Sequence, residues 1–168
     1  MKVLNSVIIL LISLLLISAL QAQEQKFSFP SVDLKTLDGK TFNTSEINNT
    51  GKPVLISFWA TWCKPCINEL IAYDENYVDW QEETGVKIIA ISIDDSRSID
   101  RVAPFVNGRG WEFESYLDEN GSFKRAMNVI NIPHSFLFDG DGVLVWQHTS
   151  FAPGDEEGLY ELLLEISK

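Results

Sequence analysis

The stretch Val54–Leu70 constrains the fold more than any other part of the chain. It reads VLISFWATWCKPCINEL, an apolar run that reaches the pair Cys63 and Cys66 and continues with helical character. Ser57 is the only polar residue of the run before Thr61, a composition typical of a central strand buried on both faces. Pro65 would stand in the first helical turn, where its missing N–H breaks no hydrogen bond. The stretch therefore predicts a buried strand that enters a helix at the cysteines.

The cysteine pair is better explained by chemistry than by structural stabilisation. Cys63 and Cys66 are the only two cysteines of the chain, and a disulfide between them closes too small a loop to stabilise the fold usefully. A zinc site needs four ligands, whereas the sequence has no second cysteine pair and only two separate histidines, His134 and His148. A c-type haem would need histidine at the position of Ile67. We therefore expect no metal and no cofactor, and a redox role for the pair.

The strand–helix junction assigns a different task to each cysteine. At a helix N-terminus, unpaired N–H groups favour thiolate over thiol and lower a cysteine pKa from about 8.5 to about 3.5–7.5. Cys63 is therefore the candidate nucleophile that attacks a disulfide. Cys66, one turn further along, is the candidate resolving thiol that attacks the mixed disulfide and releases the product.

The remaining sequence alternates between strand and helix patterns and predicts an α/β fold. Asp38-Gly39 marks an N-terminal β-hairpin, and further strands are expected at 86–93, 111–117, 135–138 and 143–148. Helices are expected at 64–83, 98–107, 122–129 and 156–167, the first with Ile67, Leu70, Ile71, Tyr77 and Val78 inward and the last with Leu159, Leu162, Leu163 and Ile166 inward. This order predicts a central mixed β-sheet flanked by helices on both faces, with the hairpin as an extension.

Two acidic clusters invite a metal interpretation that the local pattern does not favour. Asp94-Asp95-Ser96 is interpreted as the N-cap of the helix at 98–107. Asp139-Gly140-Asp141-Gly142 lacks the later ligands of a calcium loop and is interpreted as a hairpin turn.

Charge and the N-terminus indicate where the protein works. A formal net charge of −11 argues against a nucleic-acid partner, because such proteins need basic residues to neutralise phosphates. Residues 1–22 have Lys2, a long apolar run and the small residue Ala22, the layout of a secretory signal peptide. The run is also near the length of a membrane span, so an uncleaved anchor remains an alternative. Either arrangement exports the folded part, residues 23–168.

From Phe27 to the C-terminus the chain resembles the thioredoxin superfamily. The segment 58–66, FWATWCKPC, resembles the superfamily's active-site motif, and the chain is most similar to TlpA/ResA-like exported disulfide reductases. Ile132-Pro133 resembles the cis-proline loop, which in the family faces the cysteines and pairs with substrate backbone. Residues 135–142 resemble the strand and turn that come after that proline in the family.

The resemblance also implies roles for individual residues. Glu69 matches an acidic residue of ResA-like members that assists proton transfer, and we expect it to accept the proton of Cys66. The alternative for Glu69 is an exposed first-turn residue favoured by the helix dipole. Thioredoxins carry a buried aspartate where this chain has Ser57. Trp59 is expected in the core and Trp62 on the surface, where it can contact substrate.

The leading functional interpretation is an exported thiol–disulfide oxidoreductase, expected from the resemblance to act as a reductase. Its substrates would be disulfide-containing or dithiol proteins, its electrons would come from a membrane donor, and cytochrome c maturation is one role that the family allows. A peroxiredoxin is a second interpretation. That chemistry requires a threonine farther from a single peroxidatic cysteine, a preceding proline and an arginine, whereas Thr61 lies two residues before Cys63 and Pro65 follows it. A non-catalytic binding or chaperone module is the third.

Overall fold

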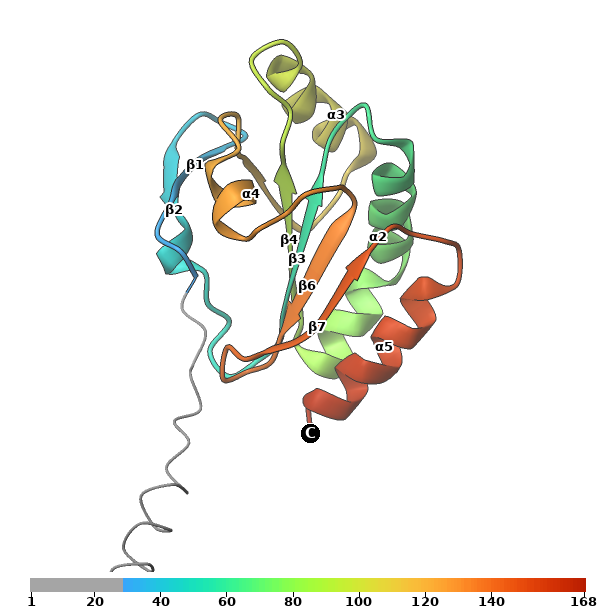
Figure 1. The fold of residues 1–168 in the computed structure, drawn as a ribbon. Helices are drawn as coiled ribbons and strands as arrows, with labels where there is room; N and C mark the ends of the chain where they lie inside the picture. Colours follow the sequence, from blue (N-terminus) through green and yellow to red (C-terminus); the bar gives the residue numbers. More distant parts are fainter. Residues whose placement is uncertain (1–28) are drawn as a thin grey trace, which may run out of the picture.

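A seven-stranded mixed sheet forms the centre of the molecule in the computed structural model, which describes residues 29–168 (Figure 1). Its strands lie in the order β2-β1-β5-β4-β3-β6-β7. β3 runs parallel to β4, and β4 to β5, whereas the remaining neighbours are antiparallel. The strands are β1 (Asp33–Thr36), β2 (Thr41–Asn43), β3 (Val54–Trp59), β4 (Lys87–Ser92), β5 (Glu114–Leu117), β6 (His134–Phe138) and β7 (Leu144–Thr149).

Helices cover both faces of this sheet, so the predicted fold class is confirmed. α2, α3 and α5 pack against one face and α4 against the other. The helices are η1 (Thr44–Glu46), α2 (Lys64–Thr84), η2 (Ile99–Arg101), α3 (Val102–Arg109), α4 (Ser122–Ala126) and α5 (Asp155–Ile166). Among the described residues, none of these helices is long and apolar enough to cross a bilayer.

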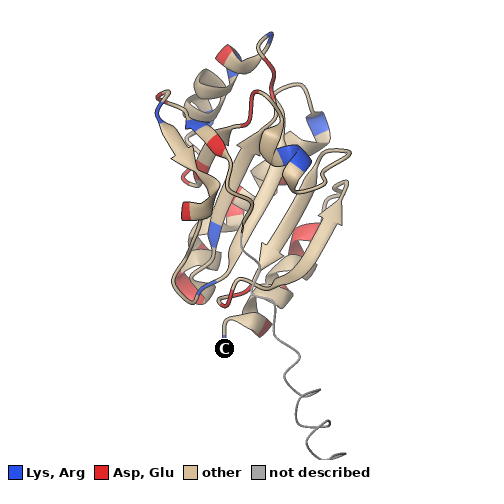
Figure 2. Ribbon diagram, turned by 60° about the vertical axis from the view of Figure 1, so that its left-hand side comes forward, with Lys and Arg blue, Asp and Glu red and all other residues tan. Residues whose placement is uncertain are grey.

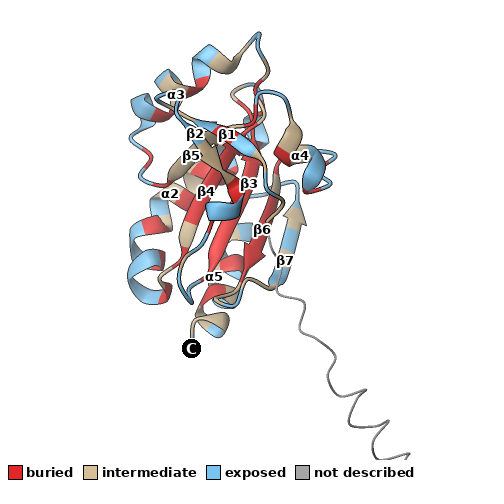
Figure 3. Ribbon diagram, turned by 90° about the vertical axis from the view of Figure 1, so that its left-hand side faces the viewer, coloured by how far each residue is buried: buried red, intermediate tan, exposed pale blue. Residues whose placement is uncertain are grey.

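The centre of the sheet is the most deeply buried region. All six residues of β3 are buried, as its continuous apolar run predicts, and Figure 3 shows β3 and β4 buried while β7 is largely exposed at the edge. Alternate residues of β3 point to opposite faces. Leu55 and Trp59 therefore join the core under α2 and α5, while Ile56 and Phe58 join the core under α4.

Charged residues lie mainly on helices, turns and strand ends, and the central strands carry almost none (Figure 2). The N-terminal hairpin is confirmed, and it joins the main sheet because β1 pairs antiparallel with β5. The turn at Asp139 is also confirmed: its side chain accepts hydrogen bonds from the N–H groups of Asp141 and Val143.

Several local predictions were wrong. Val78 is 53% exposed, because the buried face of α2 instead follows Cys66, Glu69, Leu70, Tyr73, Tyr77, Trp80 and Thr84. The inward face predicted for α5 is confirmed by contrast: Leu159 and Leu163 are buried, and the half-buried Leu162 and Ile166 pack against the same core. The helix expected at 98–107 is divided into η2 and α3, and α4 is shorter than the 122–129 segment predicted for it. The proposed signal peptide or anchor, residues 1–22, lies outside the described residues.

Candidate active site

Cys63 lies where β3 leads into α2, as the motif predicts. It is the N-cap residue of α2, and its Sγ accepts a hydrogen bond from the N–H of Cys66 at 3.3 Å. Pro65 stands in the first turn. The sulfur therefore faces the positive end of α2, an environment that stabilises a thiolate once the pair is reduced.

The two cysteines form a disulfide, so this is the oxidised state of the pair. Cys63 is 6% exposed and Cys66 is completely buried. An incoming sulfur can therefore reach Cys63 more readily than Cys66, which agrees with the nucleophilic and resolving roles expected for them.

Glu69 is a buried residue of α2, one helical turn after Cys66. The side chain is 1% exposed, which excludes the alternative of a solvated first-turn residue. Its Oε2 accepts hydrogen bonds from the hydroxyls of Ser57 at 2.7 Å and of Ser135 at 3.1 Å. The two serines are directly paired across β3 and β6, so both reach the same side of the sheet.

Burial gives Glu69 an unusual protonation equilibrium. Removal from water raises its pKa from 4.5 to about 7, even though hydrogen bonds from Ser57, Ser135 and Tyr73 act in the opposite direction. Burial, together with the charge of Glu69, likewise raises the pKa of Tyr73. A carboxyl group that titrates near neutrality, one helical turn from Cys66, can accept a proton from a thiol and release it again.

The loop before β6 has the backbone geometry expected from the resemblance. The Ile132–Pro133 peptide bond is cis, so that prediction is confirmed. Ile132 packs against the core cluster that contains both cysteines, and the carbonyl of Pro133 accepts a hydrogen bond from Ser150 N–H at 3.1 Å. His134 lies on the opposite face of the sheet from Glu69, stacked on Phe136 with burial lowering its pKa.

The turn before Cys63 is fixed by Asp94, and the predicted helix-capping role of the Asp94 cluster is wrong. The buried Asp94 carboxyl accepts hydrogen bonds from Thr61 N–H at 2.8 Å, Thr61 Oγ1 at 2.6 Å and Ser92 Oγ at 2.9 Å. No side chain caps η2. The carboxyl instead accepts hydrogen bonds from Thr61, which lies 33 residues earlier in the sequence.

The two tryptophans occupy the environments expected for them. Trp59 is completely buried, whereas Trp62 is 63% exposed beside the cysteines. Trp62 and Ile93 line a hollow of about 380 Å³ whose other lining residues are polar or charged: Asp95, Arg97, Ser98 and Arg101.

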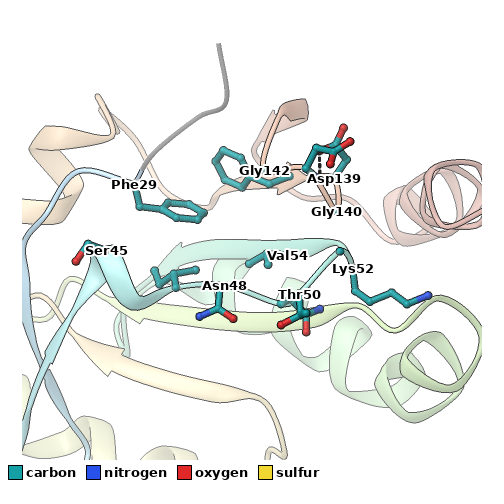
Figure 4. Close-up of a pocket in the computed structure, with 14 residues that line it drawn as sticks. Phe29, Ser45, Asn48, Thr50, Lys52, Val54, Asp139, Gly140 and Gly142 are labelled. Carbon is teal, nitrogen blue, oxygen red and sulfur yellow. Dashed lines mark hydrogen bonds between the residues drawn. The ribbon is translucent and has the colours of Figure 1, made fainter. Parts of the chain in front are cut away.

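A cavity of about 490 Å³ lies at the other end of β3, away from the cysteines (Figure 4). Phe29, Val54 and the turn at Asp139–Gly142 are among its lining residues, and Figure 4 shows the side chain of Lys52 extending away from the ring of Phe29. It contains no cysteine or histidine. Within residues 29–168 no group of three or more His, Cys, Asp or Glu side chains could hold a metal ion.

Sequence reasoning missed the partners that complete the site: Ser135, Tyr73, Thr61 and Asp94. Ser57 stands out in the sequence only as a departure from the thioredoxin pattern, yet it donates directly to Glu69. A usable signal was present, because Ser57 is the only polar residue of β3 and Ser135 is followed by the apolar residues 136–138 of β6. Buried hydroxyls require partners, and an acidic side chain on the helix after β3 is a suitable acceptor.

Comparison with known proteins agrees with this geometry. The AhpC/TSA family model matches residues 26–147. The thiol-disulfide oxidoreductase ResA of Bacillus thuringiensis subsp. konkukian is 34% identical over 116 residues, which cover 69% of this chain and 64% of that relative. The match thus spans slightly less than two thirds of the relative's length.

Two further proteins are matched over more of their length. Sporulation thiol-disulfide oxidoreductase A of Bacillus subtilis is 30% identical over 145 residues, covering 85% of this chain and 84% of the relative. The solution structure of a thioredoxin-like protein from Porphyromonas gingivalis superposes with a TM-score of 0.74 at 49% identity, covering 83% of this chain and 92% of that one. The chain therefore belongs to the AhpC/TSA family, and it is similar to relatives named thiol-disulfide oxidoreductases.

Proposed function

We propose that this protein is an exported reductase that acts on disulfides of partner proteins through Cys63 and Cys66. The observation that carries the proposal is the position of Cys63, whose sulfur caps α2 and is bonded to the buried Cys66. The family supports thiol–disulfide exchange as the chemistry. The direction, reduction rather than oxidation, rests on the resemblance to ResA-like proteins, and export rests on the apolar segment within residues 1–22.

The proposed reaction begins with the reduced pair. The Cys63 thiolate attacks one sulfur of the substrate disulfide, and the other substrate sulfur leaves as a thiolate. Cys66 then loses its proton to Glu69 and attacks Cys63 Sγ. The second substrate sulfur leaves as a thiolate and the Cys63–Cys66 disulfide forms. Two electrons thus pass from the pair to the substrate, and a membrane donor of reducing equivalents would restore the dithiol.

Substrate recognition is assigned to Trp62, Ile132 and Pro133. The exposed ring of Trp62 provides apolar contact, and the backbone of the cis-proline loop provides β-type pairing with an extended polypeptide. No nucleic acid is expected as a partner, because the net charge of −11 would repel phosphates.

Two cysteine variants test the chemistry. Cys66→Ser should accumulate mixed disulfides with substrate proteins, because the resolving thiol is missing, while Cys63→Ser should neither trap substrates nor reduce insulin disulfides. Trapping by both variants, or by neither, would contradict the roles assigned here and would favour a binding module. The trapped proteins would also identify the substrates, including any cytochrome.

The direction of electron flow is tested by a redox titration of the pair. Reducing members of the superfamily have reduction potentials of about −270 mV, and strong oxidants have reduction potentials of about −120 mV. A potential at the reducing end supports a reductase, and a potential at the oxidising end would reverse the proposed direction.

Peroxide reduction is the second candidate, because the matching family model carries the AhpC/TSA description. Asp94 engages the hydroxyl of Thr61, so this threonine is held by a neighbouring loop instead of being free to serve a peroxidatic cysteine. Hydrogen peroxide turnover measured beside insulin reduction separates the two activities. We expect the insulin reaction to dominate.

A further inference from the structure

Glu69 and Cys66 have almost no direct access to bulk water, since Glu69 is 1% exposed and Cys66 is completely buried. In the proposed function, on which this inference rests, Glu69 takes a proton from Cys66 in each turnover. Glu69 must release that proton before the next cycle. Because it is sealed from solvent, the release requires neighbouring groups that can both accept and donate a proton.

A row of paired residues crosses the sheet beside Glu69. It contains groups that can carry a proton on the side toward β7 but not on the side toward β4. Ser57 pairs with Ala90 on β4 and with Ser135 on β6, and Ser135 pairs in turn with His148 on β7. Paired residues point to the same face, and across antiparallel strands their Cβ atoms lie about 4.5–5.5 Å apart. Toward β4 the row meets the methyl group of Ala90, which cannot carry a proton. Toward β7 it remains polar as far as His148.

His148 connects this row to the surface. Its side chain is 40% exposed, and its Nε2 lies 3.4 Å from Oδ2 of Asp155, the first residue of α5. An imidazole ring can both accept and donate a proton through its two nitrogens, and the Asp155 carboxylate gives the His148 ring a polar partner at the surface. Asp155 is also close enough to affect the interior. Burial is the main cause of the raised pKa values of Glu69 and Tyr73, and the negative charge of Asp155 adds a smaller increase to both.

We propose that His148, partnered by Asp155, is the solvent end of a proton route that starts at Glu69 and passes through Ser135. The Ser135 hydroxyl, which donates to Glu69 in this structure, rotates to accept the proton from Glu69 and gives its own proton toward His148. His148 then delivers a proton to water beside Asp155. Only O–H and N–H bonds form and break along this route. No atom changes its oxidation state, so the route needs no oxidant or reductant.

Titratable groups lie near both ends of the route. Among the described residues, Tyr73 on α2 and Asp155 on α5 affect Glu69, and Cys66 on α2 joins them once the disulfide is reduced. Two titratable groups lie near His148 in the described part of the chain. They are Asp155 and His134 on β6, and the charge of His148 lowers the pKa of His134. A change in proton exchange caused by His148 variants must therefore be separated from a simple change in charge near α5.

A pH jump on the oxidised protein tests the route without substrate or electron donor. The pH is raised in a stopped-flow cell from below to above the pKa of Glu69, and the infrared band of its protonated carboxyl is followed. The band lost in Glu69→Gln identifies the signal. We expect His148→Ala to slow the decay of this band by roughly tenfold to a hundredfold, a modest effect among general acid–base groups. Asp155→Asn should slow it less.

Rescue and a matched control distinguish a proton route from a structural effect. Imidazole added to the buffer should restore the His148→Ala rate, because it can carry the proton in place of the missing ring. Glu157→Gln removes the same charge from the same turn of α5, has no ion pair with His148 among the described residues, and should keep the wild-type rate. If His148→Ala does not fold, His148→Gln retains polarity and should show the same slowing.

Wild-type decay rates in both His148→Ala and His148→Gln would overturn the proposal, as would slowing that imidazole does not relieve. Equal slowing in Glu157→Gln would also overturn it, because charge near α5 would then explain the effect. None of these results depends on substrate trapping by Cys66→Ser, so failure of the route and failure of the proposed reductase function remain distinguishable.

Discussion

Two buried acids flank the active-site turn, and their hydrogen-bond partners give them different tasks. Asp94 accepts from a backbone N–H and from two hydroxyls, Thr61 Oγ1 and Ser92 Oγ, and so ties the turn before Cys63 to the end of β4. Among the described residues, the donors to Glu69 are side-chain hydroxyls, Ser57 and Ser135 among them, which can rotate when the acid gains or loses a proton. Both acids are buried, and the kind of donor separates the positional role of Asp94 from the proton-handling role proposed for Glu69.

The largest expected effect concerns Glu69 and the dependence of stability on pH. The pKa is raised from 4.5 to about 7 in the folded protein, so between these values the unfolded chain loses the proton while the folded protein keeps it. The free energy of unfolding should then fall as pH rises through this window, by about 3 kcal/mol in total from this group. Urea denaturation of the oxidised protein across pH should show this fall in wild type and a much smaller one in Glu69→Gln. Equal slopes in both proteins would show that Glu69 is not a neutral buried acid.

Asp94→Asn should have a somewhat smaller effect. The introduced NH₂ group would face donors that now point at a carboxyl oxygen, and a buried mismatch of this kind costs about 1–3 kcal/mol of the free energy of unfolding. Thermal and urea denaturation measure the loss. Asp95→Asn is the matched control, because the Asp95 side chain bonds only to Arg97 among the described residues, and the stability of this variant should be unchanged. An Asp94→Asn protein with the same free energy of unfolding as wild type would contradict the positional role of Asp94.

The smallest effect is expected from the serine donors. Ser57→Ala removes one of the hydrogen bonds that lower the pKa of Glu69, so this pKa should rise further, with a loss of about 1 kcal/mol in stability at a pH above it. Infrared titration of the Glu69 carboxyl measures the shift. Ser115→Ala serves as control, because its buried hydroxyl has no hydrogen-bond partner among the described residues. A Glu69 pKa that does not move in Ser57→Ala would show that the hydroxyl contributes little.

The sequence was most informative where structure is determined locally. The β3–α2 junction, the Cys63 N-cap, the cis bond before Pro133 and the fold class were all predictable from short motifs and from resemblance. The partners of the two acids were not, because they depend on strand register and loop packing. Ser135 meets Glu69 only because β6 pairs in register with β3, and Asp94 meets Thr61 only because β4 lies beside β3. The error at Val78 also concerns packing against other elements: the face of α2 that meets the core carries Tyr73 and Trp80, and Val78 lies outside that face.

The central claim is that Glu69 is the proton acceptor of Cys66 while Asp94 only holds the turn. The most direct test is the rate at which Cys66 resolves a preformed mixed disulfide on Cys63, measured by single-turnover kinetics across pH. In wild type the rate should rise with pH through the pKa of Glu69, near 7, because the deprotonated carboxylate is the base. Asp94→Asn should keep that step in the profile, and Glu69→Gln should be slower and lose it. The same rate and pH profile in Glu69→Gln as in wild type would contradict the claim.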